Sequence, residues 1–120
     1  INEDYHNCPH GVYGMNTRKT VRAISYRDIE YCQWMNGKTV IFLKDNETEE
    51  INKSIKEFKT KLPEIYFADC VKGYIINLYN VKRIDRVTNQ LIMKSGNKVT
   101  VSRYIFSEII RLYIRVMFGI

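Results

Sequence analysis

Cysteine, long apolar runs and leader-like segments are all scarce in this chain of 120 residues. The three cysteines are scattered and odd in number, so they predict no closed disulfide framework and favour a reducing compartment, the cytoplasm by default. The most apolar stretch, residues 105–120, includes three charged side chains and is shorter than the roughly 20 apolar residues of a spanning helix. No secretion signal follows the initial Ile1. We therefore expect no membrane partner, and we expect a fragment of a longer protein.

Motifs for catalysis are missing as well. The sequence contains no glycine-rich phosphate loop, no metalloprotease histidine pair and no nucleophile elbow, so we expect neither an enzyme nor a cofactor. His6, Cys8 and His10 form the one metal-like cluster, but a structural zinc site needs four ligands that a fold holds in place. We expect no metal, and we interpret residues 1–10 as a tail or the stub of a linker.

Positive charge is plentiful. Nineteen Lys and Arg residues against thirteen Asp and Glu give a net charge of +6 and a pI near 9.3. Such an excess on so small a body attracts polyanions, which makes nucleic acid the first partner to consider. The length fits one domain, over residues 11–120, and the nine tyrosines and five phenylalanines favour a mainly β fold.

Short strand-like segments alternate with turn residues along most of the chain. Asn36-Gly37 predicts a tight hairpin turn because both residues accept positive φ, and Gly96 predicts another. From Tyr104 onward, apolar residues recur at helical spacing and predict a C-terminal helix. Strands are expected over residues 11–15, 20–24, 38–43, 65–68, 73–78, 81–87, 90–94 and 98–102.

Residues 44–63 allow two interpretations. Apolar residues at helical spacing suggest one long helix capped by Asn46. Alternatively, a turn at Asp45-Asn46 leads into a short strand over residues 48–51. A two-turn helix then begins at Ser54, whose spacing to Glu57 matches a capping box, and Pro63 ends it. We prefer the second interpretation.

Three basic side chains stand at strand ends or loops rather than on a helix face. Lys38 follows the Asn36-Gly37 turn, Lys72-Gly73 precedes a buried strand, and Arg103 precedes the helix that starts at Tyr104. A cation at the end of a rigid strand loses little entropy on binding, and the free amides of a helix start suit a phosphate. Arginine can bond guanine in a bidentate manner, so we expect Arg103 to contribute most to specificity.

The strand after Lys72-Gly73 raises a further question. Residues 74–78 read as a strand buried on both faces, yet Asn77 places an amide inside the apolar run. We expect this side chain to bond the backbone of the Lys72-Gly73 loop and so to order it.

The segments "YFADCVKGYIINLYNVKRID" and "LIMKSGNKVTVSRYIFSEI" resemble the LytTR DNA-binding domain of bacterial response regulators. The resemblance covers about residues 11–115, is most specific over residues 66–103, and is closest to peptide-pheromone, quorum-sensing regulators of Gram-positive bacteria. It implies an elongated domain of three antiparallel sheets with a short middle helix and a C-terminal helix, whose loops enter successive major grooves.

The same resemblance implies a site and its partners. Its base-contacting positions fall on Lys38, Lys72 and Arg103. The neighbouring residues Asn36, Gly73 and Tyr104 complete the predicted DNA-binding set. The implied partners are double-stranded DNA, an upstream receiver domain and a second copy of the chain on DNA. The chain departs from the family pattern at Asp69, Val71 and Gly73, so we expect Asp69 to point away from DNA and Cys70 to be a small buried residue.

Two other classes of function remain open at this stage. One is RNA or single-stranded nucleic-acid binding by stacking on Trp34, Tyr13 and Tyr26, although packing in the core or at a sheet edge is the preferred interpretation of Trp34. The other is a protein-interaction module that docks through the exposed part of the helix over residues 104–120.

Overall fold

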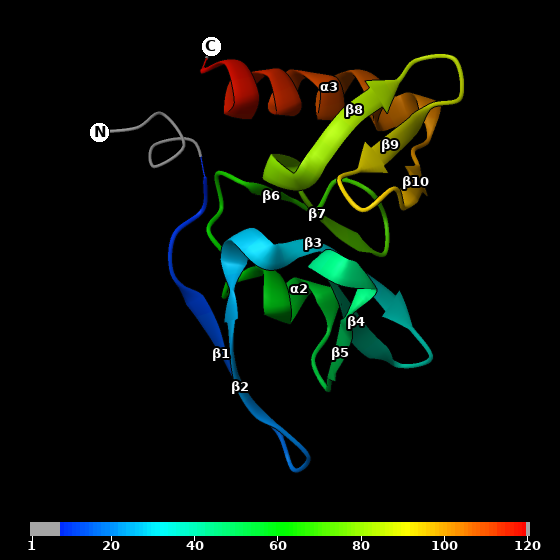
Figure 1. Ribbon diagram of the computed structural model, residues 1–120. Helices are drawn as coiled ribbons and strands as arrows, with labels where there is room; N and C mark the ends of the chain where they lie inside the picture. The colour runs from blue at the N-terminus through cyan, green and yellow to red at the C-terminus, as the bar shows by residue number, and fades with distance from the viewer. Residues whose placement is uncertain (1–7, 120) are drawn as a thin grey trace.

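A computed structural model describes residues 8–119 of the chain, which form three antiparallel sheets and a long C-terminal helix (Figure 1). The two-stranded sheet pairs β1 (Val12–Asn16) with β2 (Val21–Ser25). The five-stranded sheet has the order β5-β4-β3-β7-β6, and the three-stranded sheet has the order β10-β9-β8. These strands are β3 (Ile29–Met35), β4 (Lys38–Leu43), β5 (Thr48–Ile51), β6 (Phe67–Ala68), β7 (Tyr74–Asn77), β8 (Val81–Asp85), β9 (Gln90–Met93) and β10 (Lys98–Thr100).

Helical segments are few, and the remaining elements connect strands. The mainly β class with a short middle helix and a C-terminal helix is thereby confirmed. The helices are α2 (Ile55–Lys59) and α3 (Arg103–Phe118), and the short 3-10 turns are η1 (Tyr26–Asp28), η2 (Lys44–Asn46) and η3 (Leu78–Asn80).

Local chemistry explains the turns. Asn36 and Gly37 take φ values of 51° and 77°, and Met35 pairs with Lys38 across the predicted hairpin. Between residues 44 and 63 the second interpretation is confirmed, because β5 precedes α2 and the Ser54 hydroxyl accepts a hydrogen bond of 3.1 Å from the Glu57 amide. That bond satisfies one of the amides left open at a helix start.

The middle strand of the large sheet, β3, was not among the expected strands. Its sequence places Glu30 and Gln33 between apolar residues, which hides the alternation that usually marks a strand. The structure satisfies Glu30 by tertiary contacts and buries it to 1% exposure. Hydrogen bonds to residues far away in the sequence therefore stabilise β3, and no local pattern indicates them.

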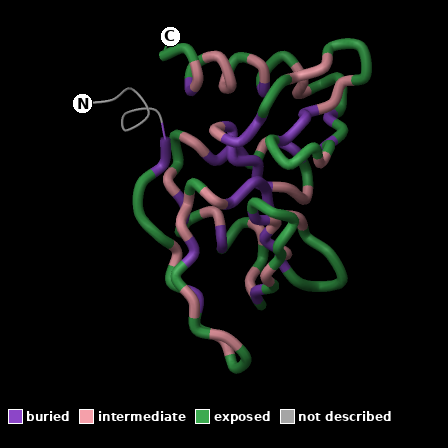
Figure 2. Tube along the Cα trace, viewed as in Figure 1, coloured by how far each residue is buried: buried purple, intermediate pink, exposed green. Residues whose placement is uncertain are grey.

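Two hydrophobic clusters cover the two faces of the five-stranded sheet. Successive residues of β7 serve both, since Ile75 belongs to the cluster under α2 and the β1-β2 hairpin, and Ile76 to the cluster under α3 and the small sheet. Strand geometry sends neighbouring side chains to opposite faces, so a strand with both faces covered is apolar throughout. Figure 2 shows this buried interior in the middle of the molecule.

The molecule is broad and flat rather than elongated. Its principal extents are 42 × 39 × 25 Å and its radius of gyration is 14.0 Å. The β1-β2 hairpin projects from one end, and α3 lies across the opposite end (Figure 1). The resemblance had implied an elongated body, but packing on both faces of the central sheet gives the chain three layers instead.

The segment expected to be a tail is partly packed. Cys8 is 3% exposed and Pro9 is buried, so the packed part of the chain begins before Gly11. His6 lies outside the described residues, and His10 is exposed. Within residues 8–119 no helix is long and apolar enough to cross a membrane.

Candidate nucleic-acid interface

Three segments define what we call the loop edge: residues 36–38, residues 69–73, and residues 102–104. The first two flank the end of β3, because the Trp34 amide donates a 2.9 Å hydrogen bond to the Gly73 carbonyl. With β3 between β4 and β7, the starts of those two strands are separated by two strand spacings, about 10 Å, across the sheet, and by two residues along β3. All three segments lie on the right-hand side in Figure 1.

The 69–73 segment also lies close to α3. Burial raises the pKa of the Cys70 thiol, and the negative charges of Glu108 in α3 and of Asp69 raise it further. The packing agrees, because Val71 and Cys70 belong to the same hydrophobic cluster as Ile109 of α3. A raised pKa keeps Cys70 in the less reactive thiol form. Cys70 is half-buried rather than buried, and Asp69 is exposed.

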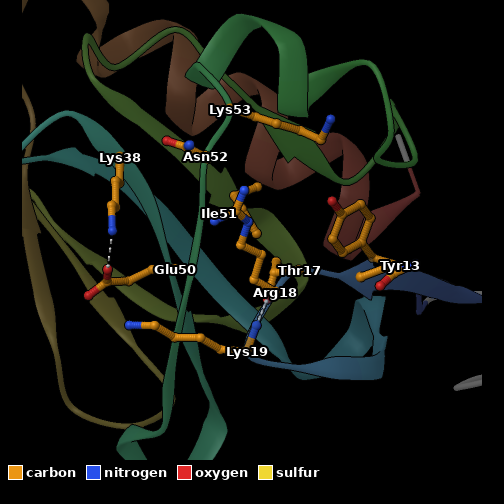
Figure 3. A pocket seen from close by; sticks show the side chains of 10 residues that line it. Tyr13, Thr17, Arg18, Lys19, Lys38, Glu50, Ile51, Asn52 and Lys53 are labelled. Carbon is orange, nitrogen blue, oxygen red and sulfur yellow. Dashed lines mark hydrogen bonds and ion pairs between the residues drawn. The ribbon is translucent and has the colours of Figure 1, made fainter.

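Lys38 begins β4, immediately after the turn. Its Nζ lies 3.5 Å from Oε1 of Glu50, and both side chains are more than half exposed (Figure 3). Exposed ion pairs of this kind contribute at most about 1 kcal/mol and are screened by salt. A stronger anion can therefore take Lys38 from Glu50 at little cost.

Lys72 occupies the tip of a tight turn that its neighbours fix. The Tyr74 amide donates to the Val71 carbonyl at 2.9 Å, and Gly73 has a φ of 81°. This arrangement fits a type II turn, whose third residue needs positive φ. Val71 is buried and anchors one side of the turn, while Lys72 is exposed.

Arg103 and Tyr104 are the first residues of α3, and both are exposed, Tyr104 to 96%. Ser102 occupies the N-cap position but makes no side-chain capping bond. The first amides of a helix have no partners within the helix and carry partial positive charge. Cationic and amide donors therefore occupy the same corner of the loop edge.

Asn77 is fully buried and does bond backbone, but not that of the Lys72-Gly73 turn. Its amide nitrogen donates to the carbonyls of Ile29 at 2.8 Å and Tyr26 at 3.2 Å, and its oxygen accepts from the Tyr79 amide at 3.1 Å. The prediction that Asn77 bonds backbone is correct, but the prediction that it orders the Lys72-Gly73 turn is wrong. Asn77 orders η1 and η3, at the far end of β7, because the carbonyls that need donors lie there.

Two other buried polar residues strengthen that far end, which we call the anchored end. Asn80 donates to the carbonyls of Ile29 at 2.7 Å and Arg27 at 2.9 Å. Glu30 accepts from the Ser95 amide at 2.8 Å and the Ser95 hydroxyl at 2.5 Å, which fastens the β9-β10 turn to β3. Sequence reasoning missed both residues, and only the apolar setting of Asn80 could have suggested its role.

The aromatic residues proposed for stacking do not come together. Tyr13 packs edge-on against Phe58 with ring centroids 4.9 Å apart, and the Tyr26 hydroxyl donates to the Lys61 carbonyl at 3.0 Å. Trp34 is 45% exposed at the end of the middle strand of the large sheet. The preferred interpretation, packing of Trp34 in the core or at a sheet edge, is therefore wrong.

The exposed side of α3 is mostly polar, and its opposite side belongs to the core through Ile109 and Val116. It therefore offers little apolar surface for docking another protein. The exposed residues of α3 are Arg103, Tyr104, Ser107, Glu108, Arg111, Arg115 and Phe118. Over residues 8–119, no group of three or more His, Cys, Asp or Glu side chains could hold a metal ion.

The fold and the loop edge define a class of protein: a β domain that presents cations on short loops to a polyanion. Residues 19–113 match the family model of the LytTr DNA-binding domain. The chain belongs to the LytTR DNA-binding domain family, and it is a DNA-binding domain of the response-regulator type.

Individual relatives agree with this assignment. The chain is similar to a solved LytTr DNA-binding domain from Bacillus cereus, described as part of a methyl-accepting/DNA response regulator. The TM-score is 0.72 and the identity 25%, over 85% of this chain and 95% of that one. It is also 28% identical over 97 residues to the sensory transduction protein LytT of Bacillus cereus. That match covers 78% of this chain but 39% of the relative, so the chain spans well under half the length of that protein.

Proposed function

We propose that the chain binds double-stranded DNA with sequence specificity and that the loop edge reads the bases. What supports this most is that Lys38 begins β4, Lys72 lies in the turn before β7, and Arg103 begins α3, and that these three elements start on the same side of Figure 1. Because buried hydrogen bonds at the anchored end fix the backbone of the sheet, the backbone that carries these side chains needs little ordering on binding.

In this proposal the three cations have different tasks. Arg103 bonds a base edge in the bidentate manner that favours guanine, and Lys38 and Lys72 make less selective contacts in the major groove. Asn36 and Gly73 supply the positive-φ turns that present the two lysines, and the helix start at Tyr104 receives a phosphate. The longest extent of the molecule, 42 Å, matches about 12 base pairs at 3.4 Å each, enough for successive grooves.

We further propose that the chain is the output domain of a two-component transcription factor. The length difference from LytT supports an additional domain in the full protein, and we expect a receiver there. We expect two copies to bind one DNA site, no catalysis, and action in the bacterial cytoplasm, where the DNA partner lies. Control by a peptide pheromone stays a prediction.

Selection of binding sites from random duplexes, followed by Arg103→Ala, tests the base-reading role. We expect Arg103→Ala to lose about 1–3 kcal/mol of binding free energy on the selected site, mainly at one base position, and much less on random duplex. Arg115→Ala, near the other end of α3, is the matched control and should bind like wild type. Equal losses on selected and random DNA would contradict base reading by Arg103.

One observation favours a second candidate, single-strand binding, because the exposed Trp34 ring could stack on a base. A titration with the selected site as a duplex and as its separate strands distinguishes the two. We expect strong preference for the duplex, since Tyr13 and Tyr26 are committed to packing.

A further inference from the structure

An open groove continues from the loop edge toward the β1-β2 hairpin. Its volume is about 490 Å³, and it lies between the hairpin turn and the end of the β4-β5 pair (Figure 3). Lys38, which we place in the base-reading set, lines both surfaces, so the groove and the loop edge are continuous. The charged residues that line the groove are Arg18, Lys19, Lys38, Lys53 and Glu50.

The hairpin that forms one wall of the groove is fixed to the sheet. Arg22 of β2 makes two hydrogen-bonded ion pairs of 2.8 Å, one with Glu47 and one with Glu49 of β5. On the inner side, Met15 and Ile24 are buried in the cluster that α2 covers. The turn at the tip of the hairpin is therefore held at a set distance from Lys38.

The turn itself is built to expose two cations. The Thr17 amide donates to the Thr20 carbonyl at 2.9 Å, and the Thr17 hydroxyl oxygen accepts from the amides of Lys19 and Thr20 at 3.3 and 3.1 Å. These bonds use the backbone and leave the side chains of Arg18 and Lys19 exposed. Neither side chain forms an ion pair with any residue between 8 and 119.

The charges in the groove favour an anion. Four cations face one carboxylate, that of Glu50, which already lies 3.5 Å from Lys38. Lys53 has a weak contact of 3.5 Å with Glu57 of α2. With no carboxylate beside Arg18 and Lys19, the groove keeps an excess of positive charge next to the surface that would face DNA.

We propose that this groove is a second DNA contact, in which Arg18 and Lys19 bind backbone phosphates of the duplex whose bases the loop edge reads. The inference rests on the proposed function, because it takes Lys38 as the shared point between base contact and phosphate contact. Flexible surface cations beside a duplex neutralise backbone phosphates, and contacts to phosphates carry no sequence information directly. Arg18 precedes the segment that matches the family model, and Lys19 is its first residue.

The test compares Arg18→Ala/Lys19→Ala with wild type, on a random-sequence duplex pool and on the selected site, as salt is varied. The logarithm of the affinity falls by roughly 0.9 per logarithm of salt for each phosphate neutralised. Loss of two contacts should lower that slope by about 1 to 2 and weaken binding roughly 10- to 50-fold near 0.1 M salt. The loss should be the same on both DNA probes.

Two control variants isolate the position of the charge from its amount. Lys82→Ala/Arg115→Ala removes the same charge from exposed positions in β8 and near the end of α3, and it should leave the slope close to wild type. Arg18→Lys/Lys19→Arg retains the charge in the hairpin and should also behave like wild type. Wild-type behaviour of this variant would show that the alanine variant does not act through a damaged turn. Circular dichroism of both variants checks the fold.

The outcomes separate this inference from the function it rests on. If the alanine variant kept the wild-type slope while wild type selected a defined site, the second contact would be wrong and the proposed function would stand. A loss confined to the selected site would mean that the hairpin reads bases, and would also overturn a phosphate contact. A wild type that selects no site would overturn the proposed function. A lower salt slope for Arg18→Ala/Lys19→Ala than for wild type would, even then, identify the hairpin as an anion contact.

Discussion

The two ends of β7 differ in almost every physical respect. At the anchored end, Asn77 is fully buried and takes part in three hydrogen bonds. At the loop edge, Lys72 is exposed, and Gly73 joins the neighbouring strand by one backbone bond, to Trp34. One short strand therefore separates a backbone fixed by buried hydrogen bonds from an exposed cationic turn.

The difference shows how a sheet can present flexible side chains at a defined place. Polar bonds in the interior have strict geometry and become strong when water is excluded, so they fix the backbone. Exposed lysines keep much of their freedom and hydration, and a weak ion pair such as Lys38–Glu50 costs little to break, so they can meet a partner readily. We expect substitutions at the anchored end to change stability, and those at the loop edge to change mainly binding.

Asn77→Leu should have the largest effect on stability. Leucine fits an apolar interior but leaves the carbonyls of Tyr26 and Ile29 without this donor, so we expect a loss of about 2–4 kcal/mol in the free energy of unfolding. Urea denaturation followed by circular dichroism measures it. Asn16→Leu, at an exposed position of β1, is the control and should change little. An equally stable Asn77→Leu variant would show that the anchored end does not depend on this amide.

Glu30→Gln should have a smaller but clear effect. The carboxylate accepts two hydrogen bonds from Ser95; an amide keeps an acceptor for the Ser95 amide, but it must donate to the Ser95 hydroxyl, and the negative charge that strengthens both bonds is lost. We expect a loss of about 1.5–3 kcal/mol, measured by the same denaturation. Glu64→Gln is the exposed counterpart and should be neutral within about 0.5 kcal/mol. Equal stability of the two variants would remove Glu30 from the anchored end.

Gly73→Ala moves the test to the loop edge. A Cβ there would meet no atom within 4 Å, so only the φ of 81° resists the change, and we expect a loss of about 1 kcal/mol. The paired variant Gly14→Ala also has free space, but it lies in a strand without positive φ and should gain up to about 1 kcal/mol. Thermal denaturation of both proteins tests the sign. Gly73→Ala should also weaken DNA binding more than its stability loss accounts for.

Lowering the pH should have the smallest effect on stability. It should weaken the ion pair between Arg22 of the β1-β2 hairpin and Glu47, which precedes β5. The hydrogen bond from Arg22 lowers the pKa of Glu47 below its usual 4.5. A lowered pKa in the folded chain means that the stabilisation is complete above about 4.5 and is lost as the pH falls through the folded value. NMR shifts of β1-β2 amides should follow this transition, and Glu47→Gln should abolish it. A transition unchanged by that substitution would assign the titration to another group.

The local parts of the fold could be predicted from the sequence. The Asn36–Gly37 turn, the Ser54 cap and the C-terminal helix depend on neighbouring residues, and the structure confirms all three. Those signals are short-range, because a turn needs positive φ and a cap needs one side-chain oxygen within three residues. The short strand over residues 48–51 was also predicted correctly, from the turn residues Asp45 and Asn46 next to it.

Partners far apart in the chain could not be predicted. Asn77 bonds residues 48 and 51 positions away, and Glu30 bonds one 65 positions away, so no local pattern indicates the target. The same reason explains why β3 was overlooked and why Asn77 was placed at the wrong loop. The three cations at strand or helix starts could be named from the sequence because their position relative to turns is local information, and their role in DNA binding stays a prediction. The groove beside the hairpin requires tertiary contacts and was missed.

Trp34 gives the protein a built-in optical reporter. It is the single tryptophan of the chain, its ring is 45% exposed, and its amide is bonded to the turn that presents Lys72. A ligand that covers this corner must change the solvent around the indole and hence its fluorescence emission. Association can therefore be followed on the unlabelled chain, with light absorbed by one side chain at the place where contact is expected.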